Sequence, residues 1–276
     1  MIDQLQDRYP VQRLCQVLEL PRSSYYARPT SQMPDPRLVT AIEQVLMRWP
    51  TYGYRRVRAQ LRREGVEASE RQVRTVLRQL GVTRQVGRVR TTDSSQPHQR
   101  YPNRLRELTV TELDQVWVAD ITYLRFGYRF FYLAVILDAY SRAIRGWSLG
   151  RRLDEALTLT ALEQALQTRQ PQVFHSDQGA QYTANLHVAL LHEAEVAVSM
   201  ADVGSPTQNA LAERFMRTLK EEHVAYADYD DFDDAYGQLK HWLEVEYMHE
   251  RIHSALDYQT PAEFEVACQP PLPRTA

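Results

Sequence analysis

The chain contains 276 residues, of which 43% are hydrophobic and 25% charged, and only two are cysteines. These values are ordinary for folded domains and exclude a largely disordered or fibrous protein. No apolar run approaches the ~20 residues of a membrane span, and the start lacks a signal-peptide pattern, so no membrane partner is expected. Cys15 and Cys268 form no C-x-x-C pair, which argues against a cysteine-based zinc site and fits a reducing cytoplasm.

Charge is unevenly distributed along the chain. Residues 1–107 hold 20 Arg, no Lys and 10 acidic residues, a balance of +10, whereas the remainder has a balance of −12. Such asymmetry suggests that the basic part faces nucleic acid while the acidic part has another task. The use of Arg strengthens this interpretation, because the guanidinium group binds phosphate through two parallel hydrogen bonds. Two domains of opposite charge by accident remain the alternative.

Residues 1–30 are interpreted as a small helix-turn-helix-like segment. Apolar residues at helical spacing predict a helix over residues 11–18, Pro21 interrupts it, and residues 22–26 begin a second helix. In a helix-turn-helix the second helix enters the major groove of DNA. Many helical hairpins share this pattern, so other functions stay open.

Residues 35–81 predict a clearer helical unit. Its last helix begins at Ser69, with Gln72 three residues later as in a capping box, and ends at Gly81. The surface opposite its apolar face carries arginines at helical spacing, and the preceding helix is also rich in arginine. The candidate DNA-binding residues are Arg55, Arg56, Arg71, Arg74 and Arg78. A solvated charged face is the alternative explanation.

Residues 82–110 lose this periodicity and fill with Thr, Ser, Gln, Pro and Arg. They predict an extended basic linker that could follow a nucleic-acid backbone. After residue 115 the pattern changes to strands and helices. The predicted strands are 116–124, 130–137, 143–149, 171–174 and 196–198, and the predicted helices are 154–168, 183–193 and 207–223. This order predicts a mixed α/β sheet flanked by helices. Trp117 and the aromatic run 130–132 are more typical of its core than of base-stacking groups.

Three acidic residues occupy positions that suit metal chemistry. Asp120 interrupts an apolar strand, where an unpaired charge is costly. Asp177 ends a strand at a glycine-containing turn, and Glu213 lies on the last long helix. Taken singly, Asp177 is typical of a turn and Glu213 of a solvated helix. Together, carboxylates from separate elements are the ligands that two-metal phosphoryl transfer requires.

The blocks around these acids resemble the three signature motifs of DDE transposases and retroviral integrases. They read Val-Trp-Val-Ala-Asp-Ile-Thr-Tyr at 116–123, His-Ser-Asp-Gln-Gly at 175–179 and Asn-Ala-Leu-Ala-Glu-Arg-Phe at 209–215. Between Asp177 and Glu213 lie 35 residues, the spacing of this group, and Lys220 matches its basic residue seven positions later. Further blocks at 52–57, 247–256 and 260–264 resemble OrfB transposases of the insertion-sequence-three family.

This resemblance implies a ribonuclease H-like mixed sheet flanked by helices at 111–225, preceded by an all-α helix-turn-helix region and followed by a helical extension at 226–276. It implies Mg²⁺-dependent cleavage of DNA and joining of 3′-hydroxyl ends, as in transposition of an insertion sequence. Asp120, Asp177 and Glu213 would be the catalytic residues and would bind two Mg²⁺ ions, for which Mn²⁺ could substitute. The supporting and DNA-contacting residues would be His175, Asn209, Arg217 and Lys220. His175 could orient a carboxylate or a water molecule, or be a plain core histidine.

The implied partners are double-stranded DNA at the element ends and the target, further copies of the chain assembled on DNA, and the product of an upstream reading frame. The implied location is the bacterial cytoplasm, in association with the nucleoid. Two other hypotheses stay open: a catalytically inactive DNA-binding regulator of transposition, and a nuclease that cuts without joining.

Overall fold

The computed structural model describes residues 9–21, 25, 35–82, 101–126, 129–202 and 206–269. The chain divides into two compact units, residues 1–40 and 41–276. Most of the predicted linker 82–110, and the second helix predicted at 22–26 apart from Tyr25, lie outside the described residues. Within the described part, no helix is both long and apolar enough to cross a membrane.

The described helices of the basic part follow the predicted pattern. They are α2 (Val11–Val17), α4 (Pro36–Arg48), α5 (Tyr54–Arg63) and α6 (Glu70–Gln79). The capping box at the start of α6 is confirmed, because the Ser69 hydroxyl accepts a hydrogen bond from the Gln72 amide and the Gln72 side chain accepts one from the Ser69 amide. Gly81 follows the helix with a φ of +68°, a left-handed conformation that glycine adopts without strain.

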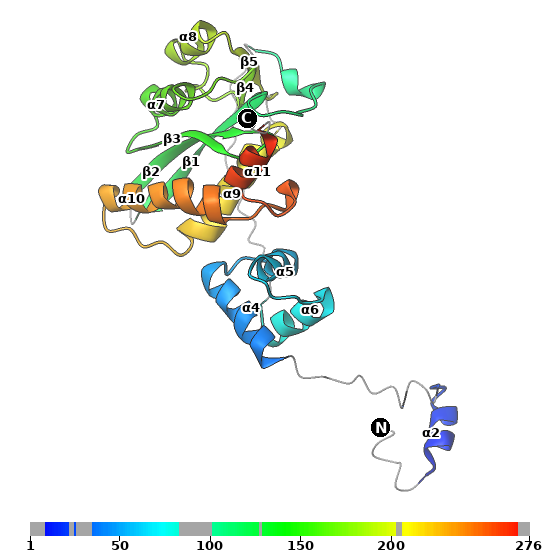
Figure 1. Cartoon of the computed structure of the whole chain (residues 1–276). Helices are drawn as coiled ribbons and strands as arrows, with labels where there is room; N and C mark the ends of the chain where they lie inside the picture. The colour runs from blue at the N-terminus through cyan, green and yellow to red at the C-terminus, as the bar shows by residue number, and fades with distance from the viewer. Residues whose placement is uncertain are drawn as a thin grey trace, which may run out of the picture. The chain divides into compact units, whose positions relative to one another are not determined.

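A five-stranded mixed sheet forms the centre of the second unit (Figure 1). Its strands are β1 (Val116–Phe126), β2 (Arg129–Asp138), β3 (Ile144–Gly150), β4 (Val173–Ser176) and β5 (Ala197–Met200). In the order β3-β2-β1-β4-β5, the first three strands are antiparallel neighbours, while β4 runs parallel to both β1 and β5. All five strands were expected from the sequence, and the predicted mixed α/β class is confirmed.

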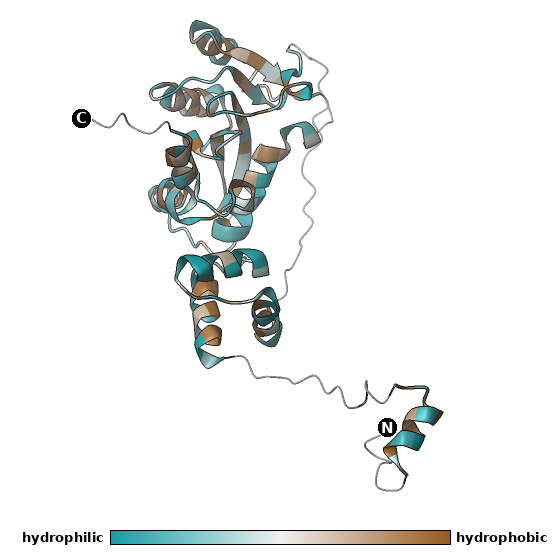
Figure 2. Cartoon of the chain, turned by 45° about the vertical axis from the view of Figure 1, so that its right-hand side comes forward, coloured by the Kyte–Doolittle hydropathy of each residue, from teal (hydrophilic) through white to brown (hydrophobic). Residues whose placement is uncertain are grey.

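Helices cover both faces of this sheet, and β1 is therefore apolar on both sides. Helices α7 (Glu155–Leu166) and α8 (Asn185–Glu193) lie over the face that receives Trp117. Helices α9 (Ala210–Leu219) and α10 (Phe232–His241) lie over the face that receives Val116 and Val118. The hydrophobic colouring of the strands in Figure 2 reflects this double burial. Phe131 is buried as predicted, but Phe130 is 46% exposed, so its predicted core position is wrong.

The helix predicted at 207–223 is a composite of three helical types. A 3-10 turn, η2 (Pro206–Asn209), leads into α9, and a π-helical turn, η3 (Lys220–Val224), follows it. The other described helices are η1 (Arg104–Arg106), a 3-10 turn within the predicted linker, η4 (Trp242–Glu250), η5 (Ser254–Leu256) and α11 (Pro261–Cys268). The residues between 206 and 224 are helical as expected, but η3 changes which side chains share a face beyond Leu219.

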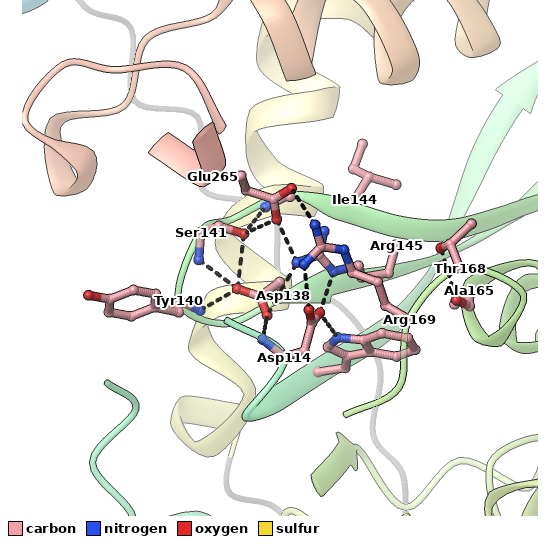
Figure 3. A network of polar contacts seen from close by, with 12 residues as sticks. Asp114, Asp138, Tyr140, Ser141, Ile144, Arg145, Ala165, Thr168, Arg169 and Glu265 are labelled. Carbon is pink, nitrogen blue, oxygen red and sulfur yellow. Dashed lines mark hydrogen bonds and ion pairs between the residues drawn. The ribbon is translucent and has the colours of Figure 1, made fainter. Parts of the chain in front are cut away.

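A buried polar network fastens α11 to the sheet (Figure 3). The Arg145 guanidinium pairs with Asp114 at 2.7 Å and with Glu265 of α11 at 2.5 Å. Asp138 is fully buried and accepts hydrogen bonds from the amides of Asp114 and Ser141, both at 2.6 Å. Because each buried charge has a partner, the network holds the C-terminal region against the ends of β2 and β3.

Candidate active site

The strand order brings Asp120 and Asp177 to the same edge of the sheet. The parallel strand β4 pairs with β1 only from Val116 to Val118, so Asp120 lies just beyond this pairing. Asp177 directly follows β4, and its carboxylate accepts a hydrogen bond from the Gly179 amide at 3.0 Å. The end of β4 therefore places Asp177 near the middle of the parallel strand β1. Ligand sites in such sheets form where the strands end.

Asn209 connects this edge to the helix that carries Glu213. Its buried side-chain amide donates a hydrogen bond of 3.0 Å to the carbonyl oxygen of Ala119, the residue before Asp120. Asn209 immediately precedes α9, and Glu213 lies in the first turn of that helix. The predicted supporting role of Asn209 thus has a geometric counterpart, because one hydrogen bond sets where α9 begins relative to Asp120.

The charges of two of the acids act on the third. Burial, together with the negative charges of Asp177 and Glu213, raises the pKa of Asp120 to about 7, against the hydrogen bond from the Ile121 amide and the charge of Lys220. Burial also raises the pKa of Asp177 and of Glu213, against a hydrogen bond from Gly179 in the first case and the charge of Arg217 in the second. The fold therefore brings Asp177 and Glu213 within electrostatic reach of Asp120.

His175 lies in β4, two residues before Asp177, and points into the core. Its ring nitrogen Nδ1 is 2.9 Å from the hydroxyl of Ser199 on β5, and that hydroxyl also accepts the amide of Arg104 at 2.9 Å. Burial lowers the pKa of His175 to about 4, so the ring is neutral at pH 7. This geometry favours the core-histidine interpretation of His175.

Lys220 and Arg217 border the acids on the side of α9. The ammonium nitrogen of Lys220 lies 4.8 Å from the centre of the Tyr123 ring, within the range of a cation–π contact. Partial burial lowers the pKa of Lys220, and the charge of Asp120 raises it. Arg217 is exposed one turn beyond Glu213, and its charge acts on that carboxylate.

Tyr182 belongs to the surroundings of Asp120 and Asp177, but it was not among the site residues predicted from the sequence. It is buried, and among the described residues its hydroxyl has no hydrogen-bond partner. The amide of Tyr182 closes the turn after Asp177 by donating to the Gly179 carbonyl at 3.0 Å. Burial together with the charges of Asp120 and Asp177 raises the pKa of Tyr182 well above its ordinary value. Its position three residues after the His-Ser-Asp-Gln-Gly block was the available signal.

The predicted DNA-binding arginines do not share one environment. Arg74 pairs with Glu70 at 2.7 Å and stacks over Tyr54, so it is not the unpaired cation that its spacing suggested. Arg56 donates to Glu222 of η3 at 3.0 Å and contributes to a buried cluster, which removes it from the solvent-facing set. Arg55, Arg71 and Arg78 are exposed and stay available to a ligand.

A mixed sheet flanked by helices, with acids on its first strand, after its fourth strand and on α9, is the architecture of a ribonuclease H-like core. Residues 111–206 and 194–261 match two families that are both described as integrase core domains. Residues 34–90 match an HTH-like domain family.

Individual relatives agree with these matches. The transposase of insertion sequence IS904 from Lactococcus lactis is 34% identical over 59% of this chain and 66% of its own length, so the chain spans slightly less than two thirds of that relative. A 31 kDa protein of insertion element IS600 from Shigella sonnei is 32% identical over 91% of this chain and 97% of its own length. The simian T-cell lymphotropic virus intasome contains a chain with the same fold, at a TM-score of 0.50 and 17% identity over 79% of this chain and 73% of that one. The chain belongs to the insertion-sequence-three family of transposases, with an integrase-type catalytic core.

Proposed function

We propose that this transposase cleaves DNA and joins the resulting 3′-hydroxyl ends to DNA at a site formed by Asp120, Asp177 and Glu213. The observation that carries the proposal is the convergence of these acids from a strand, a strand end and a helix, with the charges of two of them acting on the third. Such an accumulation of negative charge costs stability unless a cation offsets it.

The side chains present suit a hard divalent cation, because all three offer carboxylate oxygens. Among the described residues no group of three His, Cys, Asp or Glu side chains is already gathered as a metal cage. Mutual repulsion of the acids accounts for such an open arrangement. Two Mg²⁺ ions, or Mn²⁺ in their place, would activate water or a 3′-hydroxyl as nucleophile and stabilise the leaving oxygen when bound.

The chain's own residues would orient the DNA around this site. Lys220 and Arg217 would contact phosphates on either side of the scissile bond, since each offers a cation beside the acids. Asn209 would keep Glu213 in place through its hydrogen bond to Ala119. Because the nucleophile is water or a DNA hydroxyl, the chemistry calls for no covalent bond between protein and DNA.

Substrate recognition would fall to the basic part of the chain. Arg55, Arg71 and Arg78 would contact the phosphate backbone of double-stranded DNA at the element ends, with the catalytic core engaging the target. We further propose that copies of the chain assemble on the DNA, with or without the product of an upstream reading frame, and that the protein associates with the nucleoid.

The test is incubation of the full chain with Mg²⁺ and a duplex that carries its element's own ends. We expect nicked and joined products with the wild type, and neither product with Asp120→Asn, Asp177→Asn or Glu213→Gln. Glu163→Gln, which changes an exposed acid on α7, is the matched control and should retain activity. Binding without any nicking would indicate a regulator, and nicking without joining would indicate a nuclease. Strong cleavage in EDTA would also contradict the proposal.

A further inference from the structure

Two large aromatic side chains remain solvent-exposed at the far end of β1 and β2. Tyr123 is 42% exposed and Phe130 is 46% exposed. Their ring centres lie 5.7 Å apart at an angle of 84°, an edge-to-face pair. In the strand register Tyr123 is opposite Tyr132, and Phe130 is opposite Arg125, so the two aromatic residues are diagonal neighbours across the hairpin. Their exposed surface is available to a ligand.

Lys220 connects this aromatic pair to the acids. Its charge acts on Asp120, and its ammonium lies 4.8 Å from the centre of the Tyr123 ring. Tyr123 is three residues beyond Asp120, so alternation along β1 places the two side chains on opposite faces of the strand and Lys220 is the link between them. Because β4 pairs with β1 only as far as Val118, the edge of β1 that faces β4 has no neighbouring strand from Ala119 onward among the described residues, while the other edge stays paired with β2 as far as Phe126. A chain that passed over the acids could therefore continue along this edge towards Tyr123 and Phe130.

Exposed aromatic rings beside a cation are the features that bind unpaired nucleotides, since the rings stack on bases while the cation contacts a phosphate. We propose that Tyr123 and Phe130 form a platform that holds an unpaired base next to the scissile phosphate, with Lys220 contacting the adjoining phosphate. The platform would favour DNA ends whose terminal base pairs have opened. This inference rests on the proposed function, because it places the platform beside the strand that is cut.

The observations favour DNA over a protein partner. If the rings of Tyr123 and Phe130 served only to pack β1 against β2, the ammonium of Lys220 would not need to lie over the Tyr123 ring. A protein interface would be expected to cover a larger apolar surface, whereas here the ammonium of Lys220 occupies one side of the Tyr123 ring. A contact with a second copy of the chain is nevertheless distinguishable by experiment.

The experiment measures binding in EDTA, where no cleavage occurs, with the full chain and two probes. One is a duplex of the element end with two mispaired terminal nucleotides, and the other is the same duplex fully paired. Each carries 2-aminopurine at its last position. Variants Tyr123→Leu and Phe130→Leu keep an apolar side chain in the strand, and Tyr123→Phe keeps the ring. Tyr236→Leu is the matched control, because Tyr236 is also 42% exposed and contacts a ring, Trp147, on the opposite sheet edge.

We expect wild type and Tyr123→Phe to quench 2-aminopurine in the mispaired probe. The two leucine variants should lose this quenching and bind that probe about fivefold to hundredfold more weakly, the range of one lost base–aromatic stack. Binding to the paired probe and the behaviour of Tyr236→Leu should change less than about twofold.

Unchanged binding of the mispaired probe by the leucine variants would overturn the platform, as would equal losses on both probes. A change in molar mass of the DNA-free protein on Tyr123→Leu would also overturn it, by assigning the pair to a contact between copies. If quenching follows this pattern while the wild type fails to nick DNA in Mg²⁺, the proposed function fails and the platform stands.

Discussion

At the scale of single residues, Asp120 carries the electrostatic cost of the site. It is partly buried in the middle of a strand, and two other acids act on it, so its ionised form is unfavourable until a cation is present. A carboxylate whose pKa is strongly raised among other acids is typical of a functional site rather than of packing.

Asp120→Asn should therefore raise the free energy of unfolding in EDTA at pH 8, by about 1–3 kcal/mol, because it removes a buried charge and its repulsion from Asp177. The same variant should lose the stabilisation that Mg²⁺ gives to the wild type. Urea denaturation with and without Mg²⁺ measures both effects. A variant that is less stable than wild type in EDTA, or equally stabilised by Mg²⁺, would contradict this account.

Lys220 is the residue where the family resemblance and the geometry make the same prediction. Lys220→Ala should weaken binding of element ends and lower joining, while leaving metal-dependent stabilisation and the fold intact, because we expect its ammonium to contact DNA phosphate rather than to support the core. Lys240→Ala, on the exposed side of α10, is the control. If the Lys220→Ala variant joins DNA normally, or if it unfolds, Lys220 is not a DNA contact.

At the scale of elements, a buried ion pair connects the arginine-rich helix α5 to the catalytic core. Glu222 of η3 accepts hydrogen bonds from Arg251 at 2.6 and 2.8 Å and from Arg56 at 3.0 Å, and all three side chains are largely buried. Nearby, the Tyr52 hydroxyl accepts a hydrogen bond from the Ile252 amide at 3.2 Å. Glu222 lies two residues beyond Lys220 in η3, so this contact also bears on the helical turn that follows α9.

Glu222→Ala should destabilise the chain by about 3–5 kcal/mol, because it leaves Arg251 buried without a counter-charge. Burial acts to raise the pKa of Glu222, but the hydrogen bonds and charges of Arg251 and Arg56 outweigh it and lower the pKa. The stability that Glu222 contributes is therefore present at neutral pH and lost as pH falls below its usual pKa.

Urea denaturation between pH 3 and pH 7 checks this, with the neighbouring Glu221→Gln as control. Glu222→Gln should lose less stability at pH 3 than at pH 7, relative to wild type. An equal loss at both pH values would show that the carboxylate charge is not what stabilises the contact.

The strands, most helices and the three acids could be predicted because their signals are local. Alternation of apolar residues around Val116 to Val118 marks a strand, and Ser69 with Gln72 marks a helix start. Glu222 pairs with Arg251, which is 29 positions away in the sequence. Glu222 lies in a π-helical turn, and no hydrophobic periodicity in the sequence predicts such a turn or its partner. Phe130 and Phe131 are both aromatic, and only the pleat of β2 decides that one is buried and the other exposed.

At the scale of the whole molecule, the two parts of the chain carry net charges of opposite sign. The part with a balance of +10 precedes the part with a balance of −12. On the proposed function, phosphate contacts would account for affinity to DNA, and the acids around one site would account for a dependence on cations. Because Arg74 is already paired with Glu70, the free cations of α6 are fewer than its sequence suggests.

Binding of end DNA by the full chain should fall steeply with salt, by roughly 10³-fold or more between 50 and 200 mM if six or more phosphates are neutralised. Arg71→Ala and Arg78→Ala should each lower the salt slope by about one, whereas Arg74→Ala should have a smaller effect. Fluorescence anisotropy across a salt series measures the slopes. Identical salt slopes for all three variants and the wild type would show that this face of α6 does not contact DNA phosphates.

The most direct test of the account is a crystal structure of the full chain with Mn²⁺ and an element-end duplex, recorded with anomalous diffraction from the metal. We expect two Mn²⁺ peaks coordinated by oxygens of Asp120, Asp177 and Glu213, with the scissile phosphate between the metals. Metal bound elsewhere, or DNA held away from these three carboxylates, would contradict it.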